Sequence, residues 1–302
     1  MTAYRGRFAP SPSGPLHFGS MVAAVGSYLD AKANGGTWAV RIDDLDPPRI
    51  APGSIDSILG CLQAFGMQWD DEVVHQSARS DAYRTALTKL RNAGLVYACV
   101  CSRKEIEDAG SGTVYPGTCR AGIMHERRAH AWRVRTASAI IEFDDLLRGR
   151  NQQDLEQEIG DFVAFRADGI AAYHLACAVD DAAQGITHVV RGADLLDSTP
   201  RQIHMQRLLG VPTPAYLHLP VAAHADGRKL SKQTLARAVN PDEAATVLNA
   251  VLAFLNHAPP ETVRRGGLAA LWRWAIDNWR RERLPDLASI AVPDQNVSGA
   301  PS

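Results

Sequence analysis

A strand–loop–helix–strand pattern near the start of the sequence restricts the possible folds more than any other feature. Residues 4–9 (YRGRFA) and residues 37–42 (TWAVRI) are typical of short strands. Between them, the segment from Ser20 carries apolar side chains at helical spacing and ends at Gly35-Gly36, a typical helix stop. Such βαβ units build parallel sheets with helices on both faces, so we expect a doubly wound α/β fold.

The rest of the chain continues this alternation and then becomes helical. We expect helices over residues 53–66, 79–93 and 199–209 and strands over 186–192 and 216–222. From residue 241 the pattern is helical, with one apolar stripe of Leu268, Leu271, Trp272, Ala275, Ile276 and Trp279. We therefore predict an α/β domain over 1–240, a helical part over 241–285 and a frayed tail over 286–302.

Residues 96–130 interrupt the α/β rhythm, because they are rich in Cys, Gly, Arg and His. We interpret them as an inserted subdomain. The chain has five cysteines and its N-terminus lacks the apolar stretch of a secretory signal. Disulfides are therefore not expected, and clustered cysteines point to a metal. The sequence has no run of apolar residues long enough to span a membrane, so we expect a cytoplasmic protein without membrane contact.

The loop RFAPSPSGPLHFGS at residues 7–20 follows the first strand, where a doubly wound sheet binds its ligands. The helix that begins near Gly19 and Ser20 directs its free N–H groups and positive dipole end to the same place. His17 can donate to phosphate oxygens, whereas the P-loop signature GxxxxGKS is absent. A proline-rich surface loop with a helix cap is the alternative reading of this stretch alone.

A second motif, KLSKQ at residues 229–233, follows an Asp226-Gly227 turn and adds two lysines three positions apart. Together, PLHFG and KLSKQ resemble the HIGH and KMSKS signatures of class I aminoacyl-tRNA synthetases. With RIDDLDPPR at residues 41–49, the resemblance narrows to the glutamyl-tRNA synthetase subgroup and is closest to its short glutamyl-Q tRNA(Asp) synthetase branch. It extends to about residue 240 and implies a Rossmann-like class I catalytic domain.

The resemblance implies activation of L-glutamate with ATP and Mg²⁺, followed by transfer to queuosine in the anticodon arm of tRNA(Asp). Only residues 234–302 follow KLSKQ, so we expect no anticodon-binding domain, and we expect a monomer. Two alternatives stay open: a truncated enzyme that charges tRNA(Glu), and a paralogue that binds tRNA without catalysis.

The resemblance also assigns site residues. It implies catalytic roles for His17 and Lys232 and an ATP site of His17, Gly19, Lys229 and Lys232. The implied glutamate site consists of Arg7, Phe8, Ala9, Pro10, Ser11, Asp43, Tyr173 and Arg191, because two carboxylates and an ammonium need cations and an anion. Asp43 stands where the family usually has Glu, whose side chain is one methylene longer. Whether the Asp43 carboxylate reaches the ammonium of glutamate therefore stays open.

Three cysteines of the insertion, in CVC at 99–101 and YPGTC at 115–119, suggest a structural Zn²⁺ site. The family pattern supplies the ligands Cys99, Cys101, Tyr115 and Cys119. His125 is the alternative fourth ligand, and buried cysteines without metal are the alternative to a site. Cys61 and Cys177 lie in apolar surroundings and are interpreted as core residues.

Two groups of basic residues can contact tRNA phosphates, although solvated faces are the alternative for both. They are Arg103, Lys104, Arg120, Arg127 and Arg128 near the insertion, and Arg280, Arg281 and Arg283 near the C-terminus.

Overall fold

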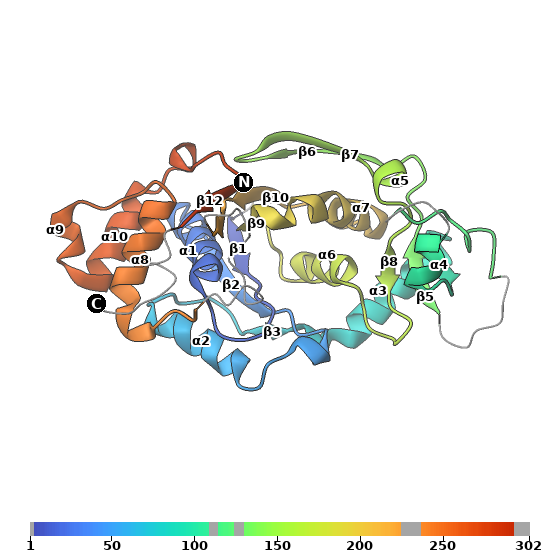
Figure 1. Cartoon of the computed structure of the whole chain (residues 1–302), viewed down its shortest axis with the longest axis horizontal. Coiled ribbons are helices and arrows are strands. Elements are labelled where there is room, and N and C mark those ends of the chain that lie inside the picture. Colours follow the sequence, from blue (N-terminus) through green and yellow to red (C-terminus); the bar gives the residue numbers. More distant parts are fainter. Residues whose placement is uncertain (1–2, 109–113, 124–129, 225–236, 293–302) are drawn as a thin grey trace.

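The computed structural model, which describes residues 3–108, 114–123, 130–224 and 237–292, is built on a mostly parallel sheet (Figure 1). Its strands are β3 (Val74–His75), β2 (Thr37–Ile42), β1 (Arg5–Phe8), β9 (His188–Gly192), β10 (Ala215–Leu219), β6 (Ile140–Asp145) and β7 (Gly149–Asp154). β1 joins β9 through Thr187, whose amide donates to the Arg5 carbonyl at 2.9 Å. β7 pairs antiparallel with β6, and the other pairs are parallel. The predicted doubly wound α/β fold is confirmed.

Helices cover both faces of this sheet (Figure 1). One face packs against α1 (Phe18–Ala33), α8 (Ala244–Phe254) and α10 (Gly267–Asn278), and the other against α3 (Ser80–Asn92), α6 (Tyr173–Ala183) and α7 (Thr199–Leu209). Strand residues alternate between the two cores: Val40 and Leu217 face the first, and Ala39 and Tyr216 face the second. By the same alternation, several polar side chains of the sheet lie on the α6 face: Arg7, Arg41, Arg191 and His218.

Two further predicted segments lie close to their expected positions. Helix α2 (Ser54–Ala64) lies within predicted residues 53–66, and the predicted strand over 216–222 becomes β10 and β11 (Val221–Ala223). Strand β12 (Ser289–Ala291) pairs parallel with β11, so residues 289–291 differ from the frayed tail that we expected. Residues 293–302 lie outside the described residues. Within the described residues, no helix is both long and apolar enough to cross a membrane.

The segment interpreted as an insertion contributes to a second, antiparallel sheet. This sheet consists of β4 (Val96–Cys99), β5 (Ala131–Val134) and β8 (Val163–Phe165), and the short helices α4 (Arg103–Asp108) and α5 (Leu155–Glu158) lie beside it (Figure 1). In the view of Figure 1 it lies at the opposite end of the molecule from α8, α9 (Glu261–Arg264) and α10.

A buried carboxylate on α1 holds the C-terminal part against the sheet. Asp30 is fully buried and accepts hydrogen bonds from Trp279 Nε1 at 3.0 Å and from Arg281 Nε at 2.7 Å and Nη2 at 2.8 Å. The Tyr4 hydroxyl donates to the same carboxylate. Burial alone would raise the pKa of Asp30, but the hydrogen bonds and charge of Arg281 outweigh it and lower the pKa.

Replacing this carboxylate should destabilise the whole fold. We expect Asp30→Asn to lower the free energy of unfolding by about 3 kcal/mol, because it breaks an ion pair whose carboxylate is buried. Since the folded-state pKa lies below the ordinary 3.8, the pair stabilises above about pH 4, and the difference from wild type should shrink as the pH falls through the lowered pKa. Urea denaturation measures both effects.

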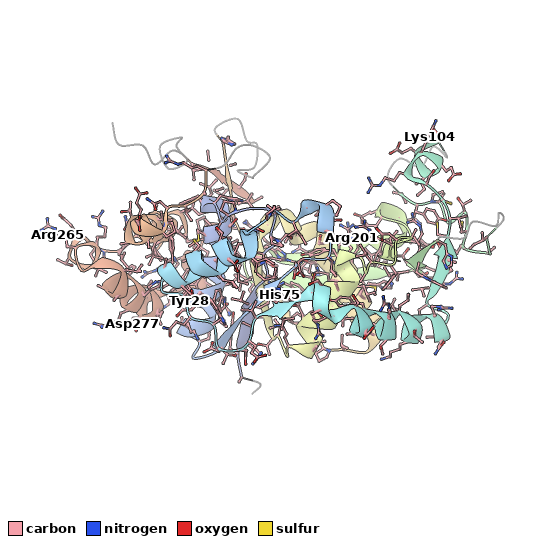
Figure 2. All side chains as sticks on the ribbon, turned by 90° about the horizontal axis from the view of Figure 1, so that it is seen from below. Tyr28, His75, Lys104, Arg201, Arg265 and Asp277 are labelled. Atoms are coloured by element: carbon pink, nitrogen blue, oxygen red, sulfur yellow. The ribbon has the colours of Figure 1, made fainter. Side chains whose placement is uncertain are left out.

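Asp277→Asn is the matched control, because Asp277 is an exposed carboxylate on α10 (Figure 2). If Asp30→Asn lowered the free energy of unfolding no more than this control does, the anchoring role of Asp30 would be contradicted.

Candidate active site

A cavity of about 430 Å³ opens at the carboxyl ends of the parallel strands. It lies between the loop after β1, the start of α1, the end of β2, the start of α6 and the end of β9. Every described residue that we predicted for the glutamate and ATP sites lines it, namely Arg7, Phe8, Ala9, Pro10, Ser11, His17, Gly19, Asp43, Tyr173 and Arg191. The fold therefore brings together residues from four distant parts of the sequence.

The predicted lysines Lys229 and Lys232 lie outside the described residues. The chain on either side of them reaches the cavity. Val221 and Ala222 line it, while Ala238 forms an isolated β-bridge with His17. The amide that follows, that of Val239, donates to the Leu16 carbonyl at 2.9 Å.

His17 is the N-cap of α1. Its Nδ1 accepts a hydrogen bond from the Ser20 amide at 3.3 Å, so the proton of the neutral ring is on Nε2. No acidic side chain occupies the first turn of α1, so the positive end of the helix dipole is not neutralised there. The cavity thus has a backbone and side-chain environment that favours anions.

A buried network of charges lies on the α6 face of the sheet, and two of its members, Arg7 and Asp43, line the cavity. Asp181 accepts from Arg41 Nη1 at 2.6 Å and from Arg7 Nε at 3.3 Å, and Asp43 accepts from Arg41 Nε at 2.7 Å. Burial would raise the pKa of Asp181, but Arg7 and Arg41 lower it. Cys177 is buried, which confirms it as a core residue, but Arg41 Nη2 lies 3.7 Å from its Sγ, so its surroundings include a charged group.

Asp43 keeps contact with the cavity despite its shorter side chain. Its amide donates to the Pro10 carbonyl at 3.0 Å, which ties the end of β2 to the loop after β1. Burial raises the pKa of the Asp43 carboxyl, although Arg41 opposes this shift. A cationic ligand group beside Asp43 would favour its ionised form.

Arg191 enters the cavity from the end of β9 and is buried. Neutral groups surround its guanidinium: Nε donates to His218 at 3.0 Å and Nη1 donates to Gln202 at 2.8 Å. Nη2 donates to Thr199 at 2.8 Å. Among the described residues, no carboxylate forms an ion pair with Arg191. Its charge is therefore available to an anionic ligand.

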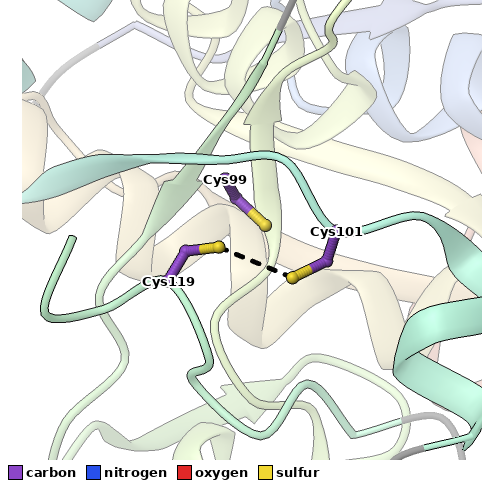
Figure 3. A group of neighbouring side chains, drawn as sticks. All are labelled: Cys99, Cys101 and Cys119. Carbon is purple, nitrogen blue, oxygen red and sulfur yellow. Dashed lines mark hydrogen bonds between the residues drawn. The ribbon is translucent and has the colours of Figure 1, made fainter. Parts of the chain in front are cut away.

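Three thiols meet beside the second sheet (Figure 3), and the phenol of Tyr115 packs in the same cluster. The Sγ atoms of Cys99, Cys101 and Cys119 lie within 4.8 Å of one another, and Cys101 Sγ is 3.5 Å from Cys119 Sγ. Tyr115 Oη is 3.3 Å from Cys99 Sγ and 3.6 Å from Cys101 Sγ. Neighbouring S and O ligands of a tetrahedral zinc are separated by about 3.5–3.8 Å. The donor set fits a metal ion; His125 lies outside the described residues.

Backbone packing holds Tyr115 in this cluster. Gly160 has φ of +70° and forms a β-bridge with Tyr115, and a Cβ at Gly160 would lie 2.5 Å from the Tyr115 carbonyl oxygen. Only glycine fits this conformation and this close approach without strain. Arg133 completes the surroundings: its Nε donates to Cys99 Sγ at 3.2 Å and its guanidinium stacks on the Tyr115 ring at 3.8 Å.

Some of the basic residues predicted to contact tRNA are exposed, and others are bound to groups of the protein. Arg103 and Lys104 are exposed on α4, and Figure 2 labels Lys104. Arg127 and Arg128 lie outside the described residues. Arg120 instead binds Asp161 at 2.7 and 3.0 Å and Glu156 at 3.3 Å.

Near the C-terminus, Arg281 is committed to Asp30, and Arg280 donates to the carbonyls of Asp277 and Trp279. Arg283 is exposed. Arg120 and Arg281 therefore have structural partners, which a count of basic residues does not reveal.

Sequence reasoning missed four residues that shape these sites: Asp181, Asp145, His218 and Arg133. Asp181 belongs to the motif VDD on α6, where adjacent acids in an apolar helix are a signal of buried cationic partners. His218 alternates with apolar residues in the strand YLHL, which places it on the buried α6 face. Arg133 has no comparable local signal.

Comparisons with known proteins agree with this site. Residues 3–256 match the family model described as class I tRNA synthetases (E and Q), catalytic domain. The glutamyl-Q tRNA(Asp) synthetase of Dechloromonas aromatica is 54% identical over 296 residues, covering 96% of this chain and 98% of the relative. That of Chromobacterium violaceum is 53% identical over 286 residues, covering 93% and 95%.

Among solved structures, glutamate-tRNA synthetase from Elizabethkingia anophelis superposes with a TM-score of 0.82 at 24% identity. The match covers 98% of this chain and 69% of that one, and it supports the fold. With the family match over most of its length and relatives of more than half identity, the chain belongs to the class I tRNA synthetases of the glutamyl and glutaminyl family.

Proposed function

We propose that this protein activates L-glutamate with ATP and transfers it to queuosine in the anticodon arm of tRNA(Asp). The observation that carries the proposal is the cavity, in which Arg7, Arg191 and Asp43 lie beside His17 and the start of α1. Relatives named glutamyl-Q tRNA(Asp) synthetase, 54% identical over nearly the whole chain, support the choice of acceptor.

The first step forms glutamyl-adenylate. A glutamate α-carboxylate oxygen attacks the α-phosphorus of ATP, a new P–O bond forms, and the bond to pyrophosphate breaks. Charge develops on the phosphate oxygens, so donors fixed in advance lower the barrier. His17 Nε2–H and the amides at the start of α1 supply them, with Mg²⁺ carried by ATP. Lys232 and, less directly, Lys229 are proposed to contact the phosphates from the segment that follows β11.

Glutamate binding uses both signs of charge in the cavity. Arg191 and Arg7 are proposed to pair with the substrate carboxylates, since guanidinium groups bind carboxylates through parallel hydrogen bonds. Asp43 is proposed to bind the ammonium, which would restore the ionised carboxylate that burial disfavours. The Tyr173 hydroxyl, at the start of α6, adds a donor.

The second step transfers glutamate to a hydroxyl of the queuosine cyclopentenediol. That oxygen attacks the carbonyl carbon of the adenylate, an ester bond forms, and AMP leaves. Because queuosine lies in the anticodon loop, the enzyme does not have to bind the anticodon and the 3′ end of the tRNA at the same time. The competing function is charging of tRNA(Glu), which shares the first step and differs only here.

Labelled glutamate separates these functions. With ATP, we expect alkali-labile label on queuosine-containing tRNA(Asp), and none on tRNA(Glu) or on tRNA(Asp) that carries guanosine in place of queuosine. Acid-precipitable counts measure the transfer. Label on tRNA(Glu) alone would replace the proposal by tRNA(Glu) charging, and an absence of glutamate-dependent ATP–pyrophosphate exchange would support a non-catalytic tRNA-binding paralogue.

The role of His17 in chemistry can be separated from its role as a helix cap. Asn is a good N-cap, so His17→Asn should preserve the start of α1 while it removes the Nε2 donor. We expect kcat of ATP–pyrophosphate exchange to fall about 100-fold, as for other preorganised donors, with an unchanged melting temperature. His17→Ala, which removes both functions, should also lower the melting temperature. Exchange by His17→Asn at the wild-type rate would refute the proposed role.

The thiol cluster is proposed to hold one structural Zn²⁺ through Cys99, Cys101, Cys119 and Tyr115. Four protein ligands would leave no position open for chemistry, and the ion would tie residues 99–101 to residues 115–119 within the insertion. Arg133 would balance the negative charge of the thiolates from outside the ligand set.

Elemental analysis tests this centre. We expect about one zinc per wild-type chain, and much less in Cys101→Ser, whose melting temperature should also fall. Cys61→Ala is the control, because Cys61 is a buried thiol in a different core. Loss of zinc in Tyr115→Phe identifies the phenol as the fourth ligand, whereas loss in His125→Ala identifies the imidazole. Equal zinc content in Cys101→Ser and wild type would disprove the site.

A further inference from the structure

Arg191 is held by a chain of buried hydrogen bonds that crosses three adjacent strands. Arg191 on β9 lies directly opposite His218 on β10, and its Nε donates to His218 Nε2 at 3.0 Å. His218 Nδ1 in turn lies 2.6 Å from Asp145 Oδ2 at the end of β6. The side chains of His218 and Asp145 are completely buried.

The chemistry of these groups fixes the position of every proton in the chain. An arginine only donates, so His218 Nε2 must carry a lone pair, and the ring proton must be on Nδ1, facing Asp145. Burial lowers the pKa of His218, although the hydrogen bond that its Nδ1–H donates to Asp145 opposes this shift, and the charge of Arg191 adds to the lowering. The ring is therefore neutral and has a single tautomer.

Asp145 is fixed independently of the ring. Its Oδ1 accepts from the amides of Leu147 at 3.0 Å, Arg148 at 2.8 Å and His218 at 3.3 Å. Burial would raise its pKa, but the hydrogen bond from His218 Nδ1 and those from the amides of Arg148 and Leu147 lower it. Asp145 Oδ2 is thus always an acceptor toward His218, which makes the direction of the chain unambiguous.

We propose that Asp145 and His218 are positioning residues for glutamate recognition: the carboxylate fixes the His218 tautomer, and His218 aims the guanidinium of Arg191 into the cavity. The inference rests on the proposed function. Selectivity for an anionic substrate then depends on this chain of hydrogen bonds. Arg191 Nε donates to the neutral His218 ring and not to a carboxylate, so the charge of Arg191 is left for the substrate. Tyr216 stacks on His218 and lies 5.4 Å from the guanidinium, which restricts both side chains.

A single substitution of equal size reverses the relay. In Asp145→Asn, the three amides at Oδ1 require the carbonyl oxygen there, so the NH₂ group faces His218 Nδ1. The ring must then carry its proton on Nε2, directly against the N–H of Arg191. Thr199 Oγ1, 3.1 Å from His218 Nε2, could accept the ring proton, but Arg191 Nε would lose its acceptor and face an N–H, so the guanidinium must move.

Two measurements test the relay. Long-range ¹H–¹⁵N spectra, with the His218 signals identified by their absence in His218→Gln, should show the Nδ1–H tautomer in wild type and Nε2–H in Asp145→Asn. In ATP–pyrophosphate exchange, Asp145→Asn should raise KM for glutamate about tenfold to a hundredfold, the loss expected for a misplaced charged hydrogen bond, and leave KM for ATP nearly unchanged.

Asp144→Asn is the matched control, because Asp144 is the exposed neighbour on the same strand, and it should behave as wild type. The Nε2–H tautomer in wild type would overturn the relay without any variant. An unchanged KM for glutamate in Asp145→Asn, with the tautomer reversed, would overturn its role in recognition. If wild type shows no glutamate-dependent exchange, the proposed function fails, while the spectra still report the relay itself.

Discussion

The candidate active site depends on one buried carboxylate. Arg7 and Arg41 project from adjacent strands onto the α6 face of the sheet, and Asp181 of α6 accepts hydrogen bonds from both. Two guanidiniums without that carboxylate would be buried next to each other, at a cost of several kcal/mol. α6 therefore does more than cover the sheet. It supplies the charge that allows a cationic pocket to exist inside the fold, and it carries Tyr173 at the rim of the same pocket.

Much of the fold was predictable because its signals are local. The βαβ unit at the start, α2, α3 and α7 follow apolar spacing and glycine stops, and each lies within about two residues of its expected position. Helix α6 and the β6–β7 hairpin were not predicted. The sequence HLACAVDDAA mixes buried acids with small apolar residues, because the cationic partners of Asp181 are distant in the sequence. The edge strand GRNQQD is polar and lacks the apolar alternation that predicts a strand, although its partner β6 is close in the sequence.

The candidate site was predictable to the extent that motifs carry it. The glycine- and proline-rich loop, RIDD, Arg191 and the three cysteines can be recognised in the sequence, and the fold assembles the described ones as expected. The residues behind them could not be found this way. Asp145, His218 and Arg133 act through side chains that meet across strands, and such pairings appear only once the register is known. Asp181 meets Arg7 and Arg41 only because α6 packs on the sheet. Arg120 is the opposite case: the sequence suggested a contact with tRNA, but in the structure Arg120 forms an ion pair with Asp161.

The anchoring of Asp30 has a consequence for biosynthesis. Its partner Arg281 is 251 positions further along the chain, and the β-bridge between His17 and Ala238 spans almost as much of it. Ribosomes add roughly 5–20 residues per second. Helix α1 must therefore wait many seconds, with a carboxylate that belongs in the interior still bound to water, before the residues that neutralise it are translated. The loop at residues 7–20, near the beginning of the sequence, is therefore among the last parts to be completed.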